Sequence, residues 1–177
     1  MTETNSESDL VAQAKRDPEA FGTLYRMHYT AIATYLLRRV GEESTAEDLA
    51  AETFIAAFKA IRRYRDTGAP FRAWLYRIAS NKANRWSRSQ KRAIAPARSE
   101  PASRDAESGA LLRQAIETLP SDMRSVITLG YWTPMTTAQV AQALGVAEGT
   151  VKSRLARARL ALKNEIERQE AREGGAR

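Results

Sequence analysis

The 177-residue sequence contains no cysteine and one histidine, His28. Without cysteine the chain has no disulfide framework, no thiolate nucleophile and no zinc ribbon, and a single histidine excludes a multi-histidine metal site. No apolar run approaches the roughly 20 residues that a membrane-spanning helix needs. The amino-terminal stretch MTETNSESDL is polar and acidic, so we expect no secretory signal, no membrane insertion and a cytoplasmic location. Because the chain also lacks a P-loop and an activated nucleophile, we expect neither an enzyme nor a bound cofactor or metal.

Charge, in contrast, is abundant and unevenly distributed. The formal net charge is +7 and the isoelectric point about 10, which indicates a polyanionic partner. Residues 71–92 contain seven Lys and Arg, and residues 150–163 contain five; neither segment has an acidic residue. Residues 41–52 contain five Asp and Glu and no basic residue. Segments of opposite charge kept apart in this way imply separate partners for separate faces.

The spacing of apolar residues predicts an all-α fold, and we find no alternating pattern of the kind that strands show. Capping residues, Pro18 and closing glycines mark the expected helix ends. In the first half we expect a helix capped by Asp9, a helix over residues 17–41, and a helix capped by Ser44 that runs to about residue 64. A loop over residues 65–70 then precedes a helix over residues 71–88.

The helical period breaks over residues 89–109, which contain two prolines and several serines. We therefore expect two small helical domains, residues 9–92 and 110–167, joined by a flexible linker over residues 93–109. Fully extended, the 21 residues of the broken stretch reach ~70 Å. The charged end of the chain, residues 168–177, is predicted to be a disordered tail.

Residues 136–163, TTAQVAQALGVAEGTVKSRLARARLALK, are typical of a helix-turn-helix. Ala141 is small, Gly145 sits where the turn needs a left-handed residue, and Val151 is a branched apolar residue. These intervals let two helices pack closely at a steep angle, and the second helix of such a motif enters the DNA major groove. On its outer face lie Lys152, Ser153, Ala156 and Arg157. The alternative is a solvated basic face on an ordinary packing helix.

Two further stretches carry candidate binding chemistry. The helix from Phe71 alternates basic and aromatic residues and contains Asn81, a combination that suits single-stranded nucleic acid, although an inward Phe71 or Trp74 is more often a core residue. Residues 47–52 are acidic and precede Phe54 and Phe58. They fit either favourable charge at a helix amino terminus or a docking face for a basic protein surface.

Four motifs occur in order: AEDLAAETF (46–54), FRAWLYRIASNKANRW (71–86), LP-x-x-x-R (119–124) and ALGVAEGTVKSRLARAR (143–159). Together they resemble the small extracytoplasmic-function (group IV) sigma factors of bacterial RNA polymerase, members of the sigma-70 family. The resemblance covers about residues 9–167. It implies sigma region 2 in the first half and sigma region 4 in the second. A stand-alone helix-turn-helix regulator is the alternative function.

The resemblance also implies partners and roles for particular residues. The partners are core RNA polymerase (clamp helices of the largest subunit and flap of the second largest), promoter DNA and an anti-sigma factor. Polymerase docking is expected of Asp48, Glu52, Phe54 and Phe58. Melting and recognition of the minus-10 element are expected of Arg65, Phe71, Arg77, Asn81, Lys82, Arg85 and Arg88. Recognition of the minus-35 element is expected of Thr150, Lys152, Ser153, Arg154, Ala156 and Arg157.

The sequence departs from the family pattern at a few positions. Ala51 stands where the family commonly has glutamine in the docking motif, so we do not expect the polar contact that glutamine would make there. Ala138 and Gln139 stand where acids are often found in the first helix of the helix-turn-helix, which weakens any contact with an activator there. Neither a family zinc site nor a carboxy-terminal extension is recognisable.

Overall fold

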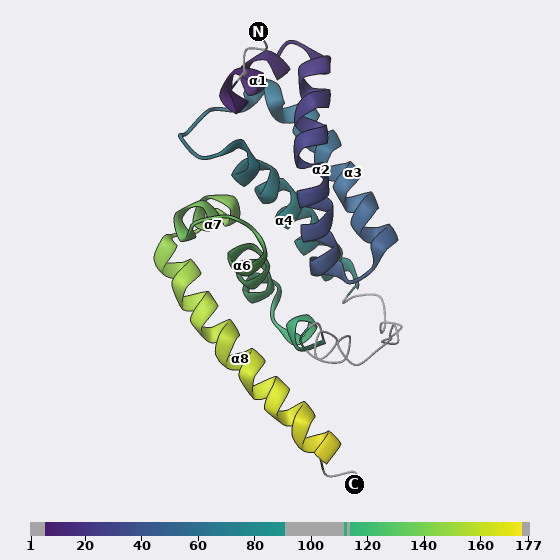
Figure 1. Ribbon diagram of the computed structural model, residues 1–177, viewed down its shortest axis with the longest axis vertical. Helices are drawn as coiled ribbons and strands as arrows, with labels where there is room; N and C mark the ends of the chain where they lie inside the picture. Colours follow the sequence, from purple (N-terminus) through teal and green to yellow (C-terminus); the bar gives the residue numbers. More distant parts are fainter. Residues whose placement is uncertain (1–5, 91–111, 113, 175–177) are drawn as a thin grey trace.

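The computed structural model describes residues 6–90, 112 and 114–174. Every regular element in these residues is a helix, which confirms the all-α prediction (Figure 1). Residues 114–118 are helical as well, and the linker predicted over residues 93–109 lies outside the described residues. The elements are α1 (Glu7–Ala14), α2 (Pro18–Val40), α3 (Glu43–Ala60), the short 3₁₀ helix η1 (Ile61–Arg63), α4 (Phe71–Gln90), α6 (Ser121–Trp132), α7 (Thr137–Leu144) and α8 (Glu148–Gly174).

Helices α2, α3 and α4 pack against one another and form the first half, with α1 against α2. Asp17 caps α2 by accepting a hydrogen bond from the backbone of Glu19, and Pro18 occupies its first turn. Gly41 ends α2 with φ at 80°, a left-handed conformation that glycine adopts without strain. These local signals set the length of α2 and therefore the length of the face that it buries. The core of this half includes Leu24, Leu36, Ala50, Leu75 and Ala79.

Two predicted caps are wrong by a few residues. Ser6, not Asp9, caps α1, and the carboxylate of Asp9 completes a capping box by accepting hydrogen bonds from Ser6. Glu42, not Ser44, caps α3, because its carboxylate accepts the backbone N–H groups of both Ser44 and Thr45. In both places an adjacent polar residue satisfies the free amides of the first turn.

The second half contains α6, α7 and α8, of which α7 and α8 form the predicted helix-turn-helix. Thr136 and Gln139 make a capping box at the start of α7, and Gly145 ends it with φ at 67°. Helix α8 continues to Gly174, so residues 168–174, which we expected to be a disordered tail, are helical. Ile116, Leu119, Ile127 and Ala158 form a small core beneath α6 and α8.

The two halves pack against each other. Helix α7 lies along α4, and α6 contacts both α2 and α4 (Figure 1). The buried cluster of the first half continues without a break into Val126, Leu129, Val140 and Val151 of the second. Within the described part of the chain, no helix is both long and apolar enough to cross a bilayer.

Candidate nucleic-acid and protein interfaces

Helix α3 exposes acidic and apolar side chains together. Asp48 and Glu52 are exposed, and Phe58 is 47% exposed with its ring edge-on to Phe21 at 5.1 Å. Ile55, which sequence reasoning missed, is 55% exposed on the same helix. The sequence spacing could have identified Ile55. It lies three residues after Glu52 and three before Phe58, and such positions share one side of a helix. An acid-flanked apolar surface of this kind suits a protein partner.

Phe54 has a different place. It is only 4% exposed and packs edge-on against Tyr25 at a centroid distance of 4.8 Å. In this arrangement Phe54 supports the exposed face of α3 from beneath. A direct contact of its ring with polymerase stays a prediction.

Phe71 also lies in the core, where it is 4% exposed. Its ring centroid is 5.4 Å from Tyr64, 5.3 Å from Trp74 and 5.7 Å from His28. Tyr64 and Phe71 flank the loop over residues 65–70, so this aromatic cluster fixes both ends of that loop. The predicted contact between Phe71 and an unpaired base therefore needs the ring to become accessible.

His28 stabilises the same region. Its Nε2 lies 2.7 Å from a carboxylate oxygen of Glu7 on α1, so the pair ties α1 to α2. Burial lowers the pKa of His28, and the neighbouring Glu7 carboxylate opposes that shift.

Apart from Phe71, the predicted minus-10 residues of α4 lie on its solvent-facing side. Arg77, Asn81 and Arg88 follow one another at helical spacing, and all three are exposed, as is Arg85. Arg65 is exposed on the preceding loop. Lys82 differs, because its ammonium pairs with the Glu52 carboxylate at 2.7 Å. We call Arg65, Arg77, Asn81, Arg85 and Arg88 the strand face.

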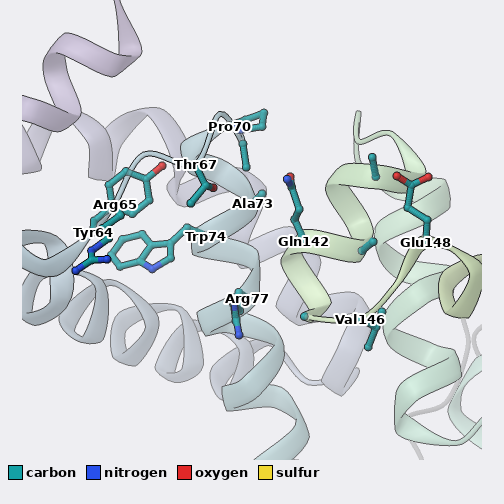
Figure 2. Close-up of a pocket in the computed structure, with 14 residues that line it drawn as sticks. Tyr64, Arg65, Thr67, Pro70, Ala73, Trp74, Arg77, Gln142, Val146 and Glu148 are labelled. Carbon is teal, nitrogen blue, oxygen red and sulfur yellow. The ribbon is translucent and has the colours of Figure 1, made fainter.

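A cavity of about 460 Å³ lies where the strand face meets the second half (Figure 2). Arg65, Trp74 and Arg77 line it from the loop and α4. Gln142 lines it from α7, Val146 from the following turn and Glu148 from the start of α8. The Arg77 guanidinium passes close to Gly145, where a Cβ atom would lie 3.3 Å from Nη2. The helix-turn-helix therefore covers one end of the strand face.

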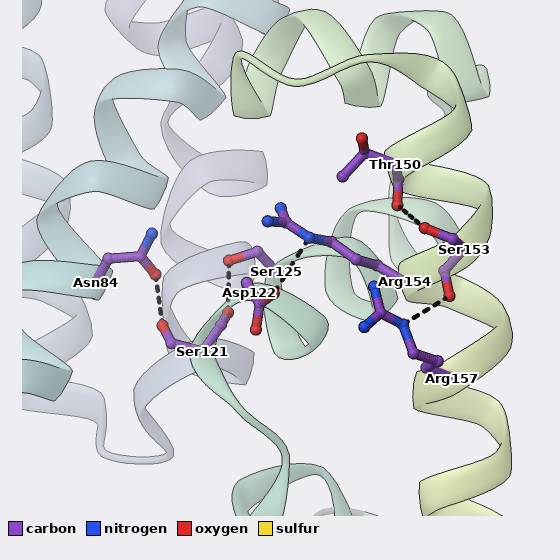
Figure 3. Close-up of polar contacts among 8 residues, drawn as sticks. All are labelled: Asn84, Ser121, Asp122, Ser125, Thr150, Ser153, Arg154 and Arg157. Carbon is purple, nitrogen blue, oxygen red and sulfur yellow. Dashed lines mark hydrogen bonds and ion pairs between the residues drawn. The ribbon is translucent and has the colours of Figure 1, made fainter.

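The predicted minus-35 residues lie along the first turns of α8 (Figure 3). Lys152, Ser153, Ala156 and Arg157 are exposed, and we call these four the groove face. Ser153 donates to the carbonyl of Thr150 at 3.0 Å, and Arg157 donates to the carbonyl of Ser153 at 3.5 Å. Both bonds go to backbone carbonyls of α8 itself, so the exposed side chains remain available to a ligand.

Arg154 points the other way, toward α6. Its Nε lies 3.1 Å from a carboxylate oxygen of Asp122 (Figure 3). The ion pair holds α8 against α6, and this contact competes with any contact of Arg154 with a base. Among the described residues, no group of three His, Cys, Asp or Glu side chains is arranged to hold a metal ion.

Sequence reasoning also missed a polar junction between the halves. Arg39, Asn84 and Ser121, from α2, α4 and α6, are linked by hydrogen bonds. Arg124, the arginine of the LP-x-x-x-R motif, lies beside them and donates to backbone carbonyls, including that of Leu119 at 3.2 Å. Such clusters join residues far apart in the chain and leave no local pattern.

Two family models match the chain. Residues 24–93 match sigma-70 region 2, and residues 109–162 match sigma-70 region 4. These matched segments correspond to the two halves of the fold, with the strand face in the first and the groove face in the second.

Curated relatives and solved structures agree with the family models. The ECF RNA polymerase sigma factor SigL of Mycobacterium tuberculosis is 36% identical over 142 residues, which cover 75% of this chain and 80% of SigL. The ECF RNA polymerase sigma-E factor of Salmonella typhimurium is 32% identical over 190 residues, covering 94% and 97%.

Among solved structures, CnrH in complex with the cytosolic domain of CnrY is 29% identical with a TM-score of 0.71, covering 89% of this chain and 95% of that chain. RpoE of Bartonella quintana, solved with the anti-sigma factor NepR, has a TM-score of 0.69 over 83% and 96% at 24% identity, which supports the fold alone. The chain matches two sigma-70 regions in order, and it has a relative that is 32% identical over nearly the full length of both proteins. It therefore belongs to the extracytoplasmic-function sigma factors of RNA polymerase, which direct transcription initiation.

Proposed function

We propose that this sigma factor uses three separate surfaces: a docking face on α3 for core polymerase, the strand face on α4 for the melted minus-10 element, and the groove face on α8 for the minus-35 duplex. The observation that carries the proposal is that exposed side chains of different chemical character lie on different helices. Acidic and apolar side chains gather on α3, whereas exposed basic and amide side chains gather on α4 and α8. Each surface therefore suits one of the expected partners.

The docking face consists of Asp48, Glu52, Ile55 and Phe58. Phe58 and Ile55 lose exposed apolar surface when a partner covers them, and fully burying a side chain of this size contributes roughly 1.5–3 kcal/mol. The two carboxylates add attraction to a basic surface. The proposed partner is the pair of clamp helices in the largest polymerase subunit, while the flap of the second-largest subunit binds region 4.

On the strand face, Asn81 offers both donor and acceptor atoms to the edge of an unpaired base. Arg65, Arg77, Arg85 and Arg88 lie around it and supply charge for the phosphates. Phe71 contributes to the strand face from within the core, as Phe54 does to the docking face, because both are 4% exposed. We assign Phe71 to holding the loop over residues 65–70 in position.

On the groove face, Lys152 and Arg157 reach base edges or phosphates, while Ser153 and Ala156 allow the backbone of α8 to approach the duplex. Arg154 is committed to Asp122 at 3.1 Å. We therefore assign Arg154 to setting the angle of α8, with Thr150 beside it at the start of the helix.

The proposed mechanism needs no bond-making residue, cofactor or enzyme activity. Unpairing and flipping a base costs a few kcal/mol. Binding to polymerase and to the minus-35 duplex offsets this cost, and capture of particular unpaired bases selects the sequence.

The packed arrangement of the two halves does not allow both DNA contacts at once. Elements about 25 base pairs apart are separated by ~85 Å along straight B-DNA, whereas α4 and α7 are in direct contact. The residues between α4 and residue 112 reach ~70 Å when extended, so they suffice for a wide separation of the halves. We therefore propose that the halves separate when the sigma factor engages polymerase and promoter.

A protein inhibitor is the remaining proposed partner. The similar protein CnrH was solved in complex with the cytosolic domain of CnrY, and this chain matches it over 89% of its length. We propose that a comparable partner covers the docking face or the strand face of this chain until a signal releases it.

Run-off transcription with core polymerase on a library of genomic fragments tests the proposed function. We expect specific transcripts only when the protein is added. Asn81→Ala should impair initiation on duplex promoters while leaving binding to the upstream duplex nearly unchanged. Equal losses in both assays would refute the role of Asn81, and a failure to associate with core polymerase at modest ionic strength would refute the proposal as a whole.

A further inference from the structure

Arg39 lies at the junction of the two halves. It belongs to the last turn of α2 and is 1% exposed. Its Nη2 donates to Oδ1 of Asn84 on α4 at 2.7 Å and to Oγ of Ser121 on α6 at 3.2 Å. Ser121 also donates to the same oxygen of Asn84 at 2.7 Å (Figure 3). The three side chains connect both halves where α6 begins.

The charge of Arg39 is poorly compensated in this position. Nε and Nη1 have no hydrogen-bond partner among the described residues, and no carboxylate oxygen of those residues lies within 4.0 Å of the guanidinium. A second cation, the half-buried Arg124, donates to the carbonyl of Arg39 at 3.5 Å. Burial lowers the pKa of Arg124, and the charge of Arg39 lowers it further, while Glu117 acts in the opposite direction. Burying a charge without a partner is strongly unfavourable.

Other contacts favour the packed arrangement. Arg38 lies over the ring of Trp132 on α6 at 5.2 Å, and Arg72 donates to the carbonyl of Pro134 at 3.0 Å. Helix α7 packs its apolar side on α4, and the buried cluster is continuous across the halves. Among the described residues, the packed arrangement thus combines favourable apolar and polar contacts with one buried charge that no carboxylate pairs.

We propose that Arg39 sets the balance between the packed and the separated arrangement, by keeping the packed one weak enough for the protein to open. Separation exposes its guanidinium to water, which can satisfy Nε and Nη1 and screens the repulsion from Arg124. The proposal rests on the proposed function in one respect, that the halves must separate to engage polymerase and promoter. In the packed arrangement the chain would then restrain its own DNA binding without an inhibitor. Arg39 would limit how strong that restraint is.

Substitution by methionine isolates the charge. Methionine keeps much of the apolar stem that Arg39 packs at the junction, and Oδ1 of Asn84 keeps its hydrogen bond from Ser121 at 2.7 Å. Replacing buried charges by apolar side chains of similar volume is often stabilising. Arg39→Met should therefore tighten the packed arrangement, and Arg39→Lys, which retains a charge, serves as the matched control. Trp132→Ala should have the opposite effect, because it removes the contact with Arg38.

The test measures the distance between the halves in the free protein. Because the chain has no cysteine, the exposed Thr34 on α2 and Asn164 on α8 can be replaced by cysteine and labelled for pulsed dipolar spectroscopy. We expect Arg39→Met to lower the population with long distances several-fold and to slow association with core polymerase, and Trp132→Ala to raise that population. Arg39→Lys should resemble the parent protein.

Some outcomes would overturn the inference. If Arg39→Met opens the protein or leaves its distance distribution unchanged, Arg39 does not limit packing. If the methionine variant does not fold, Arg39→Gln, which also removes the charge, must show the same shift toward short distances, and its failure to do so has the same consequence. The parent protein distinguishes the two proposals, because specific transcripts from it support the proposed function whatever the Arg39 variants do.

Discussion

The Glu52 carboxylate on α3 pairs with the Lys82 ammonium on α4 at 2.7 Å, so a predicted polymerase-docking residue holds a predicted DNA-binding residue. The side chain of Glu52 is 55% exposed and that of Lys82 is 28% exposed. An ion pair this accessible contributes at most ~1 kcal/mol. The pair is therefore weak enough for Lys82 to exchange its carboxylate partner for a phosphate.

Lys82→Met tests that exchange. We expect the variant in holoenzyme to bind a fork-junction promoter more weakly, and the slope of log K against log salt to fall by roughly 0.7, the value for one phosphate contact on a single strand. Titrations at several salt concentrations measure the slope. Lys59→Met on the exposed side of α3 is the control. An unchanged slope would show that Lys82 does not contact the strand.

Glu52→Gln separates the two roles of the carboxylate. If Glu52 docks polymerase, the affinity for core enzyme falls while DNA binding by the preformed holoenzyme is retained. The measurement is equilibrium binding of the labelled variant to core enzyme, with exposed Glu43→Gln on the same helix as control. Unchanged core affinity would restrict Glu52 to positioning Lys82.

Gly145→Ala should destabilise the helix-turn-helix. The residue has φ at +67°, and an added Cβ would lie 3.3 Å from the Arg77 guanidinium. A left-handed conformation costs a residue other than glycine roughly 1–2 kcal/mol. Urea unfolding should show a loss of this size. Gly149→Ala is the matched control, because it lies in the first turn of α8 with open space around it, and it should cause no loss. Equal stability of the two variants would contradict the assigned turn geometry.

Arg157 and Arg154 should respond differently to alanine. Arg157→Ala should lose roughly 1–3 kcal/mol of discrimination at one minus-35 position if it reads a base. Arg154→Ala should instead lower the stability of region 4 and weaken all sequences alike, because it breaks the pair with Asp122. Binding to a panel of single-base minus-35 variants tests both. A uniform loss for Arg157→Ala would indicate a phosphate contact.

Glu42 predicts a pH dependence of stability. Hydrogen bonds from Ser44 and then Thr45 lower the pKa of its carboxyl group from 4.5 to about 2. Because the folded pKa is below the unfolded one, the stabilisation is complete above pH 4.5 and is lost as the pH falls toward 2. The difference in unfolding free energy between the parent and Glu42→Gln should therefore be largest near neutral pH and vanish in acid. A pH-independent difference would contradict this capping role.

Local sequence was sufficient for much of the fold. Pro18, Gly41 and Gly145 act on the backbone of their own segment, so the ends of α2 and α7 were predictable. The caps of α1 and α3 were not, because neighbouring polar residues compete for the same amides. Glu42 and Ser44 are both suitable caps, and only the folded geometry selects between them.

The candidate site was predictable where exposure follows from helical spacing, as for the groove face. It was not predictable where residues distant in the sequence determine what a side chain contacts. Arg39 reads in the sequence as an ordinary basic residue in the last turn of a helix, yet its partners lie 45 and 82 residues away. Arg154 has the residue type and position expected of a DNA contact, but it faces Asp122, a residue of another helix.

The most direct test of the central claim follows the distance between the labelled positions 34 and 164 during initiation. We predict short distances in the free protein and an increase of tens of ångströms once core polymerase and promoter DNA are bound. Specific transcripts from a complex in which the distance remains that of the free protein would contradict the account.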